Sequence, residues 1–411
     1  MRVLLSSWGS RGDVEPLMGL AVALRKRDVE ARVCAPPDFA ELAARAGVPL
    51  IPLGESLRDM LHGKKPLTPA DAPRTAANLV AMQFDTVAPV AEGCDAVVAS
   101  GLMPAGLRTI AEVRGIPYVL VALHPWPIPS PHHAPLSRPG KPFPPGADNR
   151  VRWQVDAERV QALYGVPLNT HRAALGLPPV DNVRDHVFTE RPWLAADPIL
   201  APWPGSPDFD VVATGAWIMP DERPLPADLS AFLDAGTPPV YVGFSSVRAP
   251  ADVARVAVGA IRASGHRVLV SRGWAGLGVI DDGDDCFAVG EVNHQALFKR
   301  VAAVVHHGGA GTTTTAAVAG VPQVVVPQIA DQPHWAARLA DLGVGAAHDG
   351  PTPTLESLSA ALDTATSPGT RTRAAALAGR IRTDGATVAA RRLVEVITTG
   401  RVGTEMPASR R

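Results

Sequence analysis

The chain has 411 residues, which is long enough for two domains that each bury a core of their own. Its 39 Lys and Arg residues nearly balance 40 Asp and Glu residues, and a net charge of -1 gives no reason to expect nucleic acid as a partner. Three cysteines, Cys34, Cys94 and Cys286, are odd in number and widely spaced, which argues against a disulfide framework and against a cysteine metal cluster.

The amino-terminal residues, MRVLLSSWGSRGD, lead directly into a strand and a charged turn. They lack the apolar run and the cleavage site of a signal peptide. No apolar stretch in the chain is long enough to cross a bilayer. We therefore expect a cytoplasmic protein without stable membrane insertion.

Short apolar strands alternate with amphipathic helices through the first half of the chain. Strands are expected at residues 2–5, 30–35, 48–53, 95–100 and 116–123. Helices are expected at residues 14–24, 38–46 and 105–113. This alternation predicts a parallel sheet covered by helices on both faces, in which ligands collect at the carboxyl ends of the strands.

A proline-rich segment, residues 125–149, follows His124 and interrupts the alternation. Proline fixes φ and removes a hydrogen-bond donor, so the segment is expected to be a loop. Two interpretations stay open, a binding lid at the end of a strand and a simple surface excursion. Helical character returns near residues 153–164.

The second half starts the alternation afresh after two proline-punctuated stretches, 201–210 and 219–226, that are typical of an interdomain connection. A second parallel sheet is expected, and residues 339–347 should complete it. Its strands are predicted at residues 239–244, 267–271, 286–289 and 301–305. Helices are predicted at residues 251–263, 294–299, 355–364 and 371–397, the last with an interruption at Asp384 and Gly385. The tail from Thr398 is expected to be disordered.

The most specific chemistry lies between Val301 and Gln332. A buried strand there meets two histidines and the small residues 308–311, and Thr312 is expected to open a helix. Glycines let backbone N–H groups approach a ligand closely, and the positive end of the helix dipole favours a phosphate. Asp331 and Gln332 follow with polar groups suited to hydroxyls. The stretch therefore predicts a phosphate site beside a sugar site.

Two common nucleotide-binding patterns are absent. The first strand is followed by Gly9-Ser10-Arg11-Gly12, which lacks the GxGxxG spacing that a dinucleotide pyrophosphate requires. The P-loop pattern GxxxxGK followed by Ser or Thr does not occur. A nicotinamide enzyme and a P-loop nucleotidase are therefore disfavoured.

Several motifs carry a resemblance to a known family. They are GSRGDVEPL (9–17), TERPWLAADPILAP (189–202), TGAWIMPDERPL (214–225), SRGW (271–274), GEVNHQALF (290–298), HHGGAGTT (306–313), PQIADQP (327–333) and LGVGAAHDGPTPTLESLSAAL (342–362). The chain resembles bacterial family 1 nucleotide-sugar glycosyltransferases of the GT-B fold, above all those that decorate glycopeptide antibiotics of the vancomycin and teicoplanin group. The resemblance covers nearly the whole chain and is weakest in the proline-rich loop. Sterol glycosyltransferases share GSRGD and HHGGAGT, so these motifs leave the acceptor open.

The resemblance implies an α/β fold of the GT-B type, with two doubly wound, Rossmann-like parallel-sheet domains facing each other across a cleft. The expected organisation is an N-terminal acceptor-binding domain at 1–205, an interdomain linker at 206–222, a C-terminal nucleotide-sugar donor-binding domain at 223–384, and a C-terminal helix and tail at 385–411 that could pack back on the N-terminal domain.

The resemblance also implies roles at the donor side. His307, the amides of Gly309, Ala310 and Gly311, and the Thr312 hydroxyl would hold the diphosphate and stabilise the leaving group without a metal. The alternative is a tight turn with a structural histidine, the role expected for His306.

Other donor contacts follow from the same resemblance. Ser245 would contact a phosphate, although GFSS departs from the commoner GFGS, and Trp274 and the Val292 backbone would border the base. Asp331 and Gln332 would bind sugar hydroxyls. The alternatives are a tryptophan that packs between elements and a helix cap at Asp331.

Asp13 is the expected general base. It follows the first strand at a helix start, where a carboxylate either caps the helix or faces a ligand. Residue chemistry alone favours the cap, and the resemblance favours the base. Ser10 and Arg11 would lie near the acceptor or the diphosphate.

Contacts with the acceptor are expected from the loop after the fifth strand. The candidates there are His124, Trp126 and His132, with His133 beside them.

The implied activity is an inverting transfer of a hexose, of the glucose or glucosamine type, from a UDP- or TDP-sugar to a hydroxyl of a natural-product aglycone, with a glycopeptide antibiotic favoured. The expected partners are this nucleotide-sugar donor and a small-molecule acceptor, and no cofactor or metal is expected. Three alternatives stay open: a sterol, polyketide or other apolar acceptor, a non-catalytic helper that binds sugar nucleotides, and a sugar-nucleotide epimerase. The attachment site, the nucleobase and the oligomeric state do not follow from the sequence.

Overall fold

The computed structural model describes residues 1–62, 68–136, 141–244, 253–273 and 283–400. The chain forms two compact units. The first contains residues 1–198, 202–219 and the described residues after 382, and the second contains residues 199–201 and 220–382.

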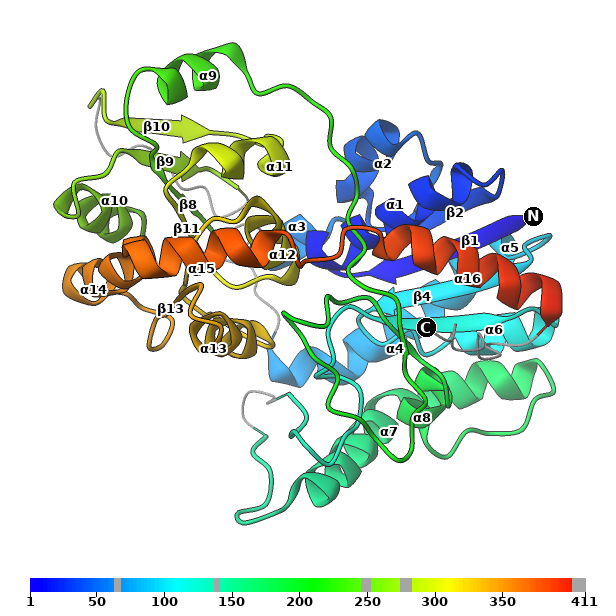
Figure 1. Ribbon diagram of the computed structural model, residues 1–411. Helices are drawn as coiled ribbons and strands as arrows, with labels where there is room; N and C mark the ends of the chain where they lie inside the picture. Colours follow the sequence, from blue (N-terminus) through cyan, green and yellow to red (C-terminus); the bar gives the residue numbers. More distant parts are fainter. Residues whose placement is uncertain (63–67, 137–140, 245–252, 274–282, 401–411) are drawn as a thin grey trace, which may run out of the picture. The chain divides into compact units, whose positions relative to one another are not determined.

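The first unit is built on one sheet of seven parallel strands in the order β3-β2-β1-β4-β5-β6-β7 (Figure 1). The interior strands consist of buried apolar residues because helices cover both faces. The strands are β1 (Arg2–Trp8), β2 (Glu30–Ala35), β3 (Leu50–Pro52), β4 (Ala96–Gly101), β5 (Tyr118–Ala122), β6 (Trp193–Leu194) and β7 (Val212–Ala213). The doubly wound arrangement predicted from the alternation is thus present.

Strand β7 lies within residues 206–222, the stretch that the sequence predicts as an interdomain linker. Residues 199–201 belong to the second unit, residues 202–219 belong to the first, and the chain enters the second unit again at residue 220. Before that point Val212 and Ala213 pair with Trp193 and Leu194 of β6 and extend the first sheet. Main-chain pairing at a sheet edge needs no distinctive side chains, so this short strand left no periodic signal.

The helices of the first unit are α1 (Arg11–Arg25), α2 (Ala40–Ala46), α3 (Leu57–His62), α4 (Ala72–Met82), α5 (Ala88–Val90), α6 (Leu107–Arg114), α7 (Asn149–Ala174), α8 (Val183–Phe188) and α16 (Gly385–Thr399). Helix α7 is much longer than the 153–164 expected, and it continues past Pro167. Helix α16 packs against α1. A Cβ at Gly385 would lie 2.3 Å from the Ala216 oxygen, so the start of α16 needs glycine for this close approach.

The proline-rich loop is ordered against α7 in its described part. The Trp153 indole N–H donates to the carbonyl oxygens of Ser130 and His133, both at 2.9 Å. The Asn149 side chain donates to the Pro131 oxygen at 2.9 Å. These bonds tie residues 130–133 to the first turns of the helix.

The second unit has its own sheet of six parallel strands in the order β10-β9-β8-β11-β12-β13. The strands are β8 (Val240–Gly243), β9 (Val268–Ser271), β10 (Cys286–Val289), β11 (Ala303–His306), β12 (Gln323–Val325) and β13 (Gly345–Ala347). The helices are α9 (Ala227–Asp234), α10 (Val253–Ala263), α11 (His294–Leu297), α12 (Ala310–Ala319), α13 (Gln332–Asp341), α14 (Leu355–Thr366) and α15 (Pro368–Ala378). Helix α12 begins two residues earlier than the Thr312 start expected.

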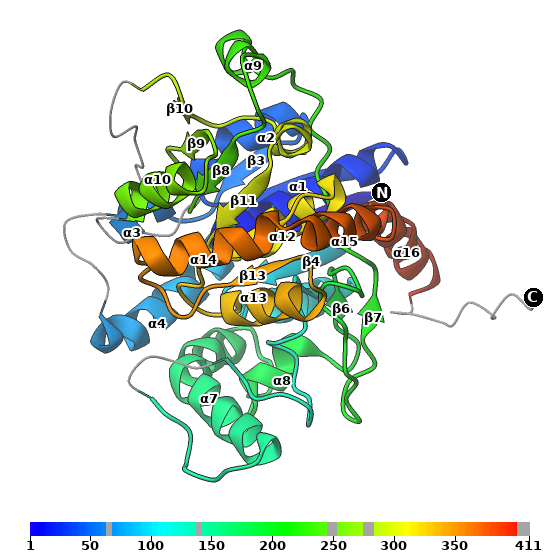
Figure 2. The ribbon, with the colours of Figure 1, turned by 60° about the vertical axis from the view of Figure 1, so that its left-hand side comes forward.

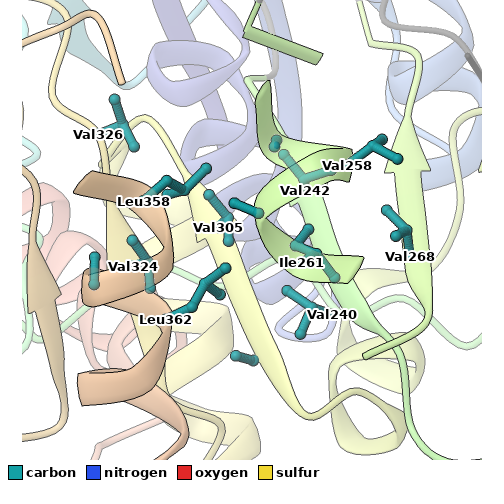
Figure 3. Packing of buried hydrophobic residues seen from close by; sticks show 14 of the residues in the cluster. Val240, Val242, Val258, Ile261, Val268, Val305, Val324, Val326, Leu358 and Leu362 are labelled. Carbon is teal, nitrogen blue, oxygen red and sulfur yellow. The ribbon is translucent and has the colours of Figure 1, made fainter. Parts of the chain in front are cut away.

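The core of the second unit lies between one face of this sheet and helices α10 and α14, as Figure 3 shows. Valines from the sheet meet Ile261 of α10 and Leu358 and Leu362 of α14, and none of these three helix side chains is exposed. Full burial of such a side chain contributes about 1.5–3 kcal/mol relative to exposure. This packing holds β11 and β12 in register, and the loops at their carboxyl ends carry the candidate site.

Among the described residues, no helix is both long and apolar enough to span a membrane. All three cysteines are thiols, and burial raises the pKa of Cys34 to about 12.

Candidate functional site

Two glycines shape the turn after β11. Gly308 has φ +93°, and a Cβ there would lie 2.7 Å from Cγ1 of Val325 and 3.2 Å from the Gln332 oxygen. A Cβ at Gly309 would lie 2.6 Å from Nε2 of His307. Side chains are therefore excluded from this turn, and its backbone packs directly against β12 and the start of α13.

The start of α12 presents unpaired amides. Gly309 is the N-cap, and the first intrahelical bond runs from the Thr313 N–H to the Gly309 oxygen at 3.0 Å. The N–H groups of Ala310, Gly311 and Thr312 precede this bond, so they point beyond the helix end. No atom lies within 4 Å of the position that a Gly311 Cβ would take. Three unpaired amides at a positive dipole end, with open space beside Gly311, suit a phosphate.

His306 maintains the shape of the turn. Its Nδ1 accepts the Gly308 N–H at 3.1 Å, so the proton is on Nε2, which donates to Oε1 of Gln323 at 2.9 Å. The Gln323 amide donates in turn to the Thr313 oxygen at 3.2 Å. Burial, with His307 nearby, lowers the pKa of His306 to about 3 and keeps the ring neutral. This network gives His306 a structural role.

His307 is the histidine available to a ligand. Its side chain is almost fully buried, and Nδ1 has no hydrogen-bond partner among the described residues. Burial lowers its pKa to about 4, although Asp331 opposes the shift. The ring is therefore neutral near pH 7 and can donate one hydrogen bond.

Asp331 and Gln332 lie at the start of α13, beside the turn. Oε1 of Gln332 accepts the N–H groups of Gln328 and Ile329 at 2.7 and 3.0 Å, so this buried amide shapes the loop. Asp331 is the N-cap residue, yet its Oδ2 accepts the indole N–H of Trp335 at 2.7 Å instead of capping the helix. The structure thus brings Asp331 near the His307 turn and gives Gln332 a supporting role that the sequence did not reveal.

Three further residues were predicted to contact the nucleotide-sugar donor, Val292, Ser245 and Trp274. The Val292 side chain is buried in a core cluster of the second unit, so only its backbone could border a ligand. Ser245 and Trp274 lie outside the described residues.

Asp13 lies in the first unit, in the first turn of α1. Ser10, not Asp13, is the N-cap, and both its N–H and its hydroxyl donate to Oδ2 of Asp13, at 2.7 and 3.1 Å. A Cβ at Gly9 would lie 2.4 Å from the same oxygen, so glycine is required there. Asp13 thus belongs to a capping box, with its carboxylate held in one orientation. Arg11 pairs with Glu15 at 2.5 Å.

The acceptor candidates separate into two places. The rings of His124 and Trp126 lie beside each other after β5, with centroids 5.2 Å apart. His132 is exposed, and its backbone N–H donates to the Ser130 hydroxyl at 3.2 Å. His133 packs edge-on against Trp153 and Trp203.

The sequence did not assign a role to two residues that support the candidate site. Gln323 accepts a hydrogen bond from His306, and Trp335 donates one to Asp331. Gln323 is a polar residue in an apolar strand, and Trp335 lies one helical turn after Asp331. Both signals were visible in the sequence, but neither identified a partner.

Family comparisons agree with this architecture. Residues 3–128 match the family model "Glycosyltransferase family 28 N-terminal domain", and residues 279–393 match "Erythromycin biosynthesis protein CIII-like, C-terminal domain".

Three relatives come from Amycolatopsis orientalis. The chain is 57% identical to "Glycosyltransferase GtfE" over 99% of both chains. It is 54% identical to "Vancomycin aglycone glucosyltransferase", covering 97% of this chain and 98% of the relative. It is 49% identical to "dTDP-epi-vancosaminyltransferase", covering 91% of this chain and 92% of the relative.

Solved structures share the fold at lower identity. The glycotransferase of kitacinnamycin has a TM-score of 0.74 at 20% identity, with 96% of this chain and 98% of that chain covered. Spinosyn forosaminyltransferase SpnP has a TM-score of 0.68 at 19% identity, with 97% and 99% covered. The expected two-domain α/β fold of the GT-B type is thereby confirmed.

Gly309→Ala should weaken binding of UDP or TDP by about tenfold or more, because the new Cβ displaces His307 and so removes a hydrogen bond to a charged group. Isothermal titration with each nucleotide measures the effect. Gly379→Ala is the matched control, since no atom lies within 4 Å of its Cβ position. Equal affinity in the two variants would contradict the phosphate cradle.

The two buried histidines should also make stability depend on pH. A histidine in the unfolded chain takes up a proton near pH 6.5, whereas His307 in the folded protein does so only near pH 4. The free energy of unfolding is therefore unaffected by this ring above about pH 6.5. It declines as the pH falls from there toward about 4, by up to about 1.4 kcal/mol per pH unit.

His307→Gln should therefore reduce the pH dependence of the unfolding free energy in this window, as measured by urea denaturation. His132→Gln, a change at an exposed histidine, serves as the control. An unchanged slope in His307→Gln would show that the ring is not held neutral by burial.

Proposed function

We propose a specific reaction for this chain on the premise that it belongs to the family 1 glycosyltransferases of the GT-B fold that act on glycopeptide antibiotics. The enzyme transfers a hexose from a UDP- or TDP-sugar to a hydroxyl of an antibiotic aglycone, with inversion at the anomeric carbon. The amide cradle at the start of α12, with neutral His307 beside it, is the observation that carries the proposal.

The cradle acts on the leaving group. Negative charge grows on the nucleoside diphosphate as the bond to the sugar breaks. The N–H groups of Ala310, Gly311 and Thr312 and the α12 dipole stabilise this charge, because they are already oriented before the reaction. His307 adds a hydrogen bond without carrying a charge of its own. These groups do the work for which other transferases use a metal ion.

Asp13 accepts the proton. The acceptor oxygen attacks the anomeric carbon from the side opposite the diphosphate, the bond to the diphosphate breaks, and the hydroxyl proton passes to the Asp13 carboxylate. The two hydrogen bonds from Ser10 hold this carboxylate in a fixed orientation. A positioned base of this kind contributes typically about 100-fold to 10,000-fold to the rate.

Asp331 holds the donor sugar. Its carboxylate is fixed by the Trp335 indole, and the loop before it is shaped by Gln332. Carboxylate oxygens accept hydrogen bonds from sugar hydroxyls. A glucose-type donor is favoured because the relative named as a glucosyltransferase is more similar to the chain than the one named as an epi-vancosaminyltransferase. The paired rings of His124 and Trp126 are the surface proposed for the acceptor.

Asp13→Asn should lower turnover by about 100-fold or more while UDP and TDP binding stay nearly unchanged, because an amide accepts the Ser10 bonds but not a proton. Steady-state kinetics and nucleotide titration together test this. Asp28→Asn, after the end of the same helix, makes the same chemical change away from the site. Unchanged turnover in Asp13→Asn would exclude Asp13 as the base.

The reaction itself is tested by incubating the enzyme with glycopeptide aglycones and either UDP-glucose or TDP-glucose. Mass spectrometry should show one added hexose, and NMR of the product should show inverted anomeric configuration. Nucleotide binding without product from any aglycone would favour a non-catalytic helper. An altered nucleotide sugar in the absence of acceptor would favour an epimerase.

A further inference from the structure

The first unit contains a large cavity, separate from the residues assigned to the reaction. Its volume is about 1190 Å³. It is bounded by α6, α7, α8, the start of β5, the loops that precede β6 and β7, and residues 129–131 of the proline-rich loop after β5. Figures 1 and 2 both show α8 beside α7, and the two helices are in contact. Known small-molecule sites occupy about 300–1,000 Å³, so a ligand of that size fits. Asp13, His124 and Trp126 do not line it.

Part of the cavity wall lies at the edge of the sheet opposite the turn that carries Asp13. Tyr118 in its wall is the first residue of β5 and pairs with Val97, which pairs with Leu4 near the start of β1. Asp13 follows the other end of β1, where Trp8 pairs with Gly101. Four residues of strand separate these two levels, or roughly 13 Å.

Two polar atoms in the cavity wall lack a partner. Oη of Tyr118 and Nε2 of His186 are buried without a hydrogen bond among the described residues. The Tyr118 side chain is only 8% exposed. Burying such groups unpaired is unfavourable, and both side chains line the cavity, so a ligand that reached them would complete their hydrogen bonds.

The charges around these two atoms favour an anion. Nη1 of Arg108 donates to the His186 carbonyl oxygen at 2.6 Å, and Nη1 of Arg172 pairs with Glu112 at 2.7 Å. The whole wall contains five guanidinium groups and four carboxylates, which leaves one net positive charge: Arg108, Arg150, Arg172, Arg184 and Arg191 against Glu112, Asp185, Glu190 and Asp208. Burial and the two arginines lower the pKa of His186 to about 4, so its ring is neutral near pH 7. Burial raises the pKa of Tyr118, so its hydroxyl remains a donor.

Aromatic rings form another part of the wall. Trp153 is locked by its two indole hydrogen bonds, and the Arg184 guanidinium lies over its ring, 5.8 Å from the centroid. Phe209 packs edge-on against Phe188. Trp153 and Phe209 both line the cavity and are held in place before any ligand arrives.

We propose that this cavity is a second ligand site, which binds an aromatic organic anion. Tyr118, His186 and Arg108 hold the acid group, and Trp153 and Phe209 contact the ring system. The site is distinct from the Asp13 turn, because Asp13, His124 and Trp126 do not line it, while residues 129–131 of the proline-rich loop form part of its wall.

The fluorescent aromatic sulfonate 1-anilinonaphthalene-8-sulfonate tests this site in the full chain. It should bind with one-to-one stoichiometry and stay bound when UDP or TDP saturates the donor site. Tyr118→Phe and Arg108→Met should each weaken its binding by about tenfold or more, since each removes a hydrogen bond or charge at the acid group. Fluorescence titration measures the dissociation constants.

The controls make the same chemical changes elsewhere. Tyr241→Phe removes a hydroxyl in the second unit, and Arg114→Met removes a guanidinium from α6 outside the cavity wall. Both should bind the probe as the unaltered protein does. Displacement of the probe by nucleotide, or unchanged affinity in Tyr118→Phe, would overturn the proposal.

Thermal unfolding separates a binding role from a structural one. The Tyr118 hydroxyl has no partner in the protein, so Tyr118→Phe should leave the melting temperature unchanged or raise it while probe binding falls. A lower melting temperature together with unchanged probe binding would assign the hydroxyl a structural role and contradict the site.

Discussion

The turn after β11 depends on one hydrogen-bonded histidine. His306 accepts the Gly308 N–H and donates to Gln323, and this pair of bonds ties the turn to β12. Because the same turn contains Gly309, the first amides of α12 are left facing a ligand and not a side chain. Loss of the His306 bonds would release the turn, and with it the position of His307. The neutral state of both rings follows from their burial, so the proposed attraction of a phosphate to this turn would come from the backbone amides and not from an imidazolium charge.

A comparable pair of hydrogen bonds orients the Asp13 carboxylate in the first unit. Ser10 donates twice to one oxygen of Asp13, and Gly9 allows this close approach. Capping and catalysis were alternatives in the sequence, yet the geometry makes them compatible, since a capping carboxylate is also a carboxylate with a fixed orientation. Asp331 follows the same pattern through its bond from Trp335. Asp13 and Asp331 are thus each held by a neighbour within four residues.

The fold was largely predictable, because buried parallel strands and their covering helices leave long periodic signals. The strands at β1, β2, β4 and β5 and the phosphate turn all lie where apolar runs and glycines placed them. Strand β7 and the length of α7 were not predictable. The first has two residues and rests on main-chain pairing, and the second passes through Pro167, which local rules treat as a helix breaker.

The sequence by itself determined the local chemistry: a glycine turn between β11 and α12, a carboxylate in the first turn of α1, and an aspartate at the start of α13. These features are contiguous, so spacing alone reveals them. Only the tertiary structure decided which groups meet. Packing of β11 beside β12 puts Gln323 against His306. The loop before α13 folds so that Oε1 of Gln332 accepts the Gln328 N–H. The fold also leaves Oη of Tyr118 and Nε2 of His186, two residues that line one cavity, without hydrogen-bond partners among the described residues. These contacts and unpaired atoms involve residues distant in sequence or depend on the packing around them. A short sequence motif encodes neither.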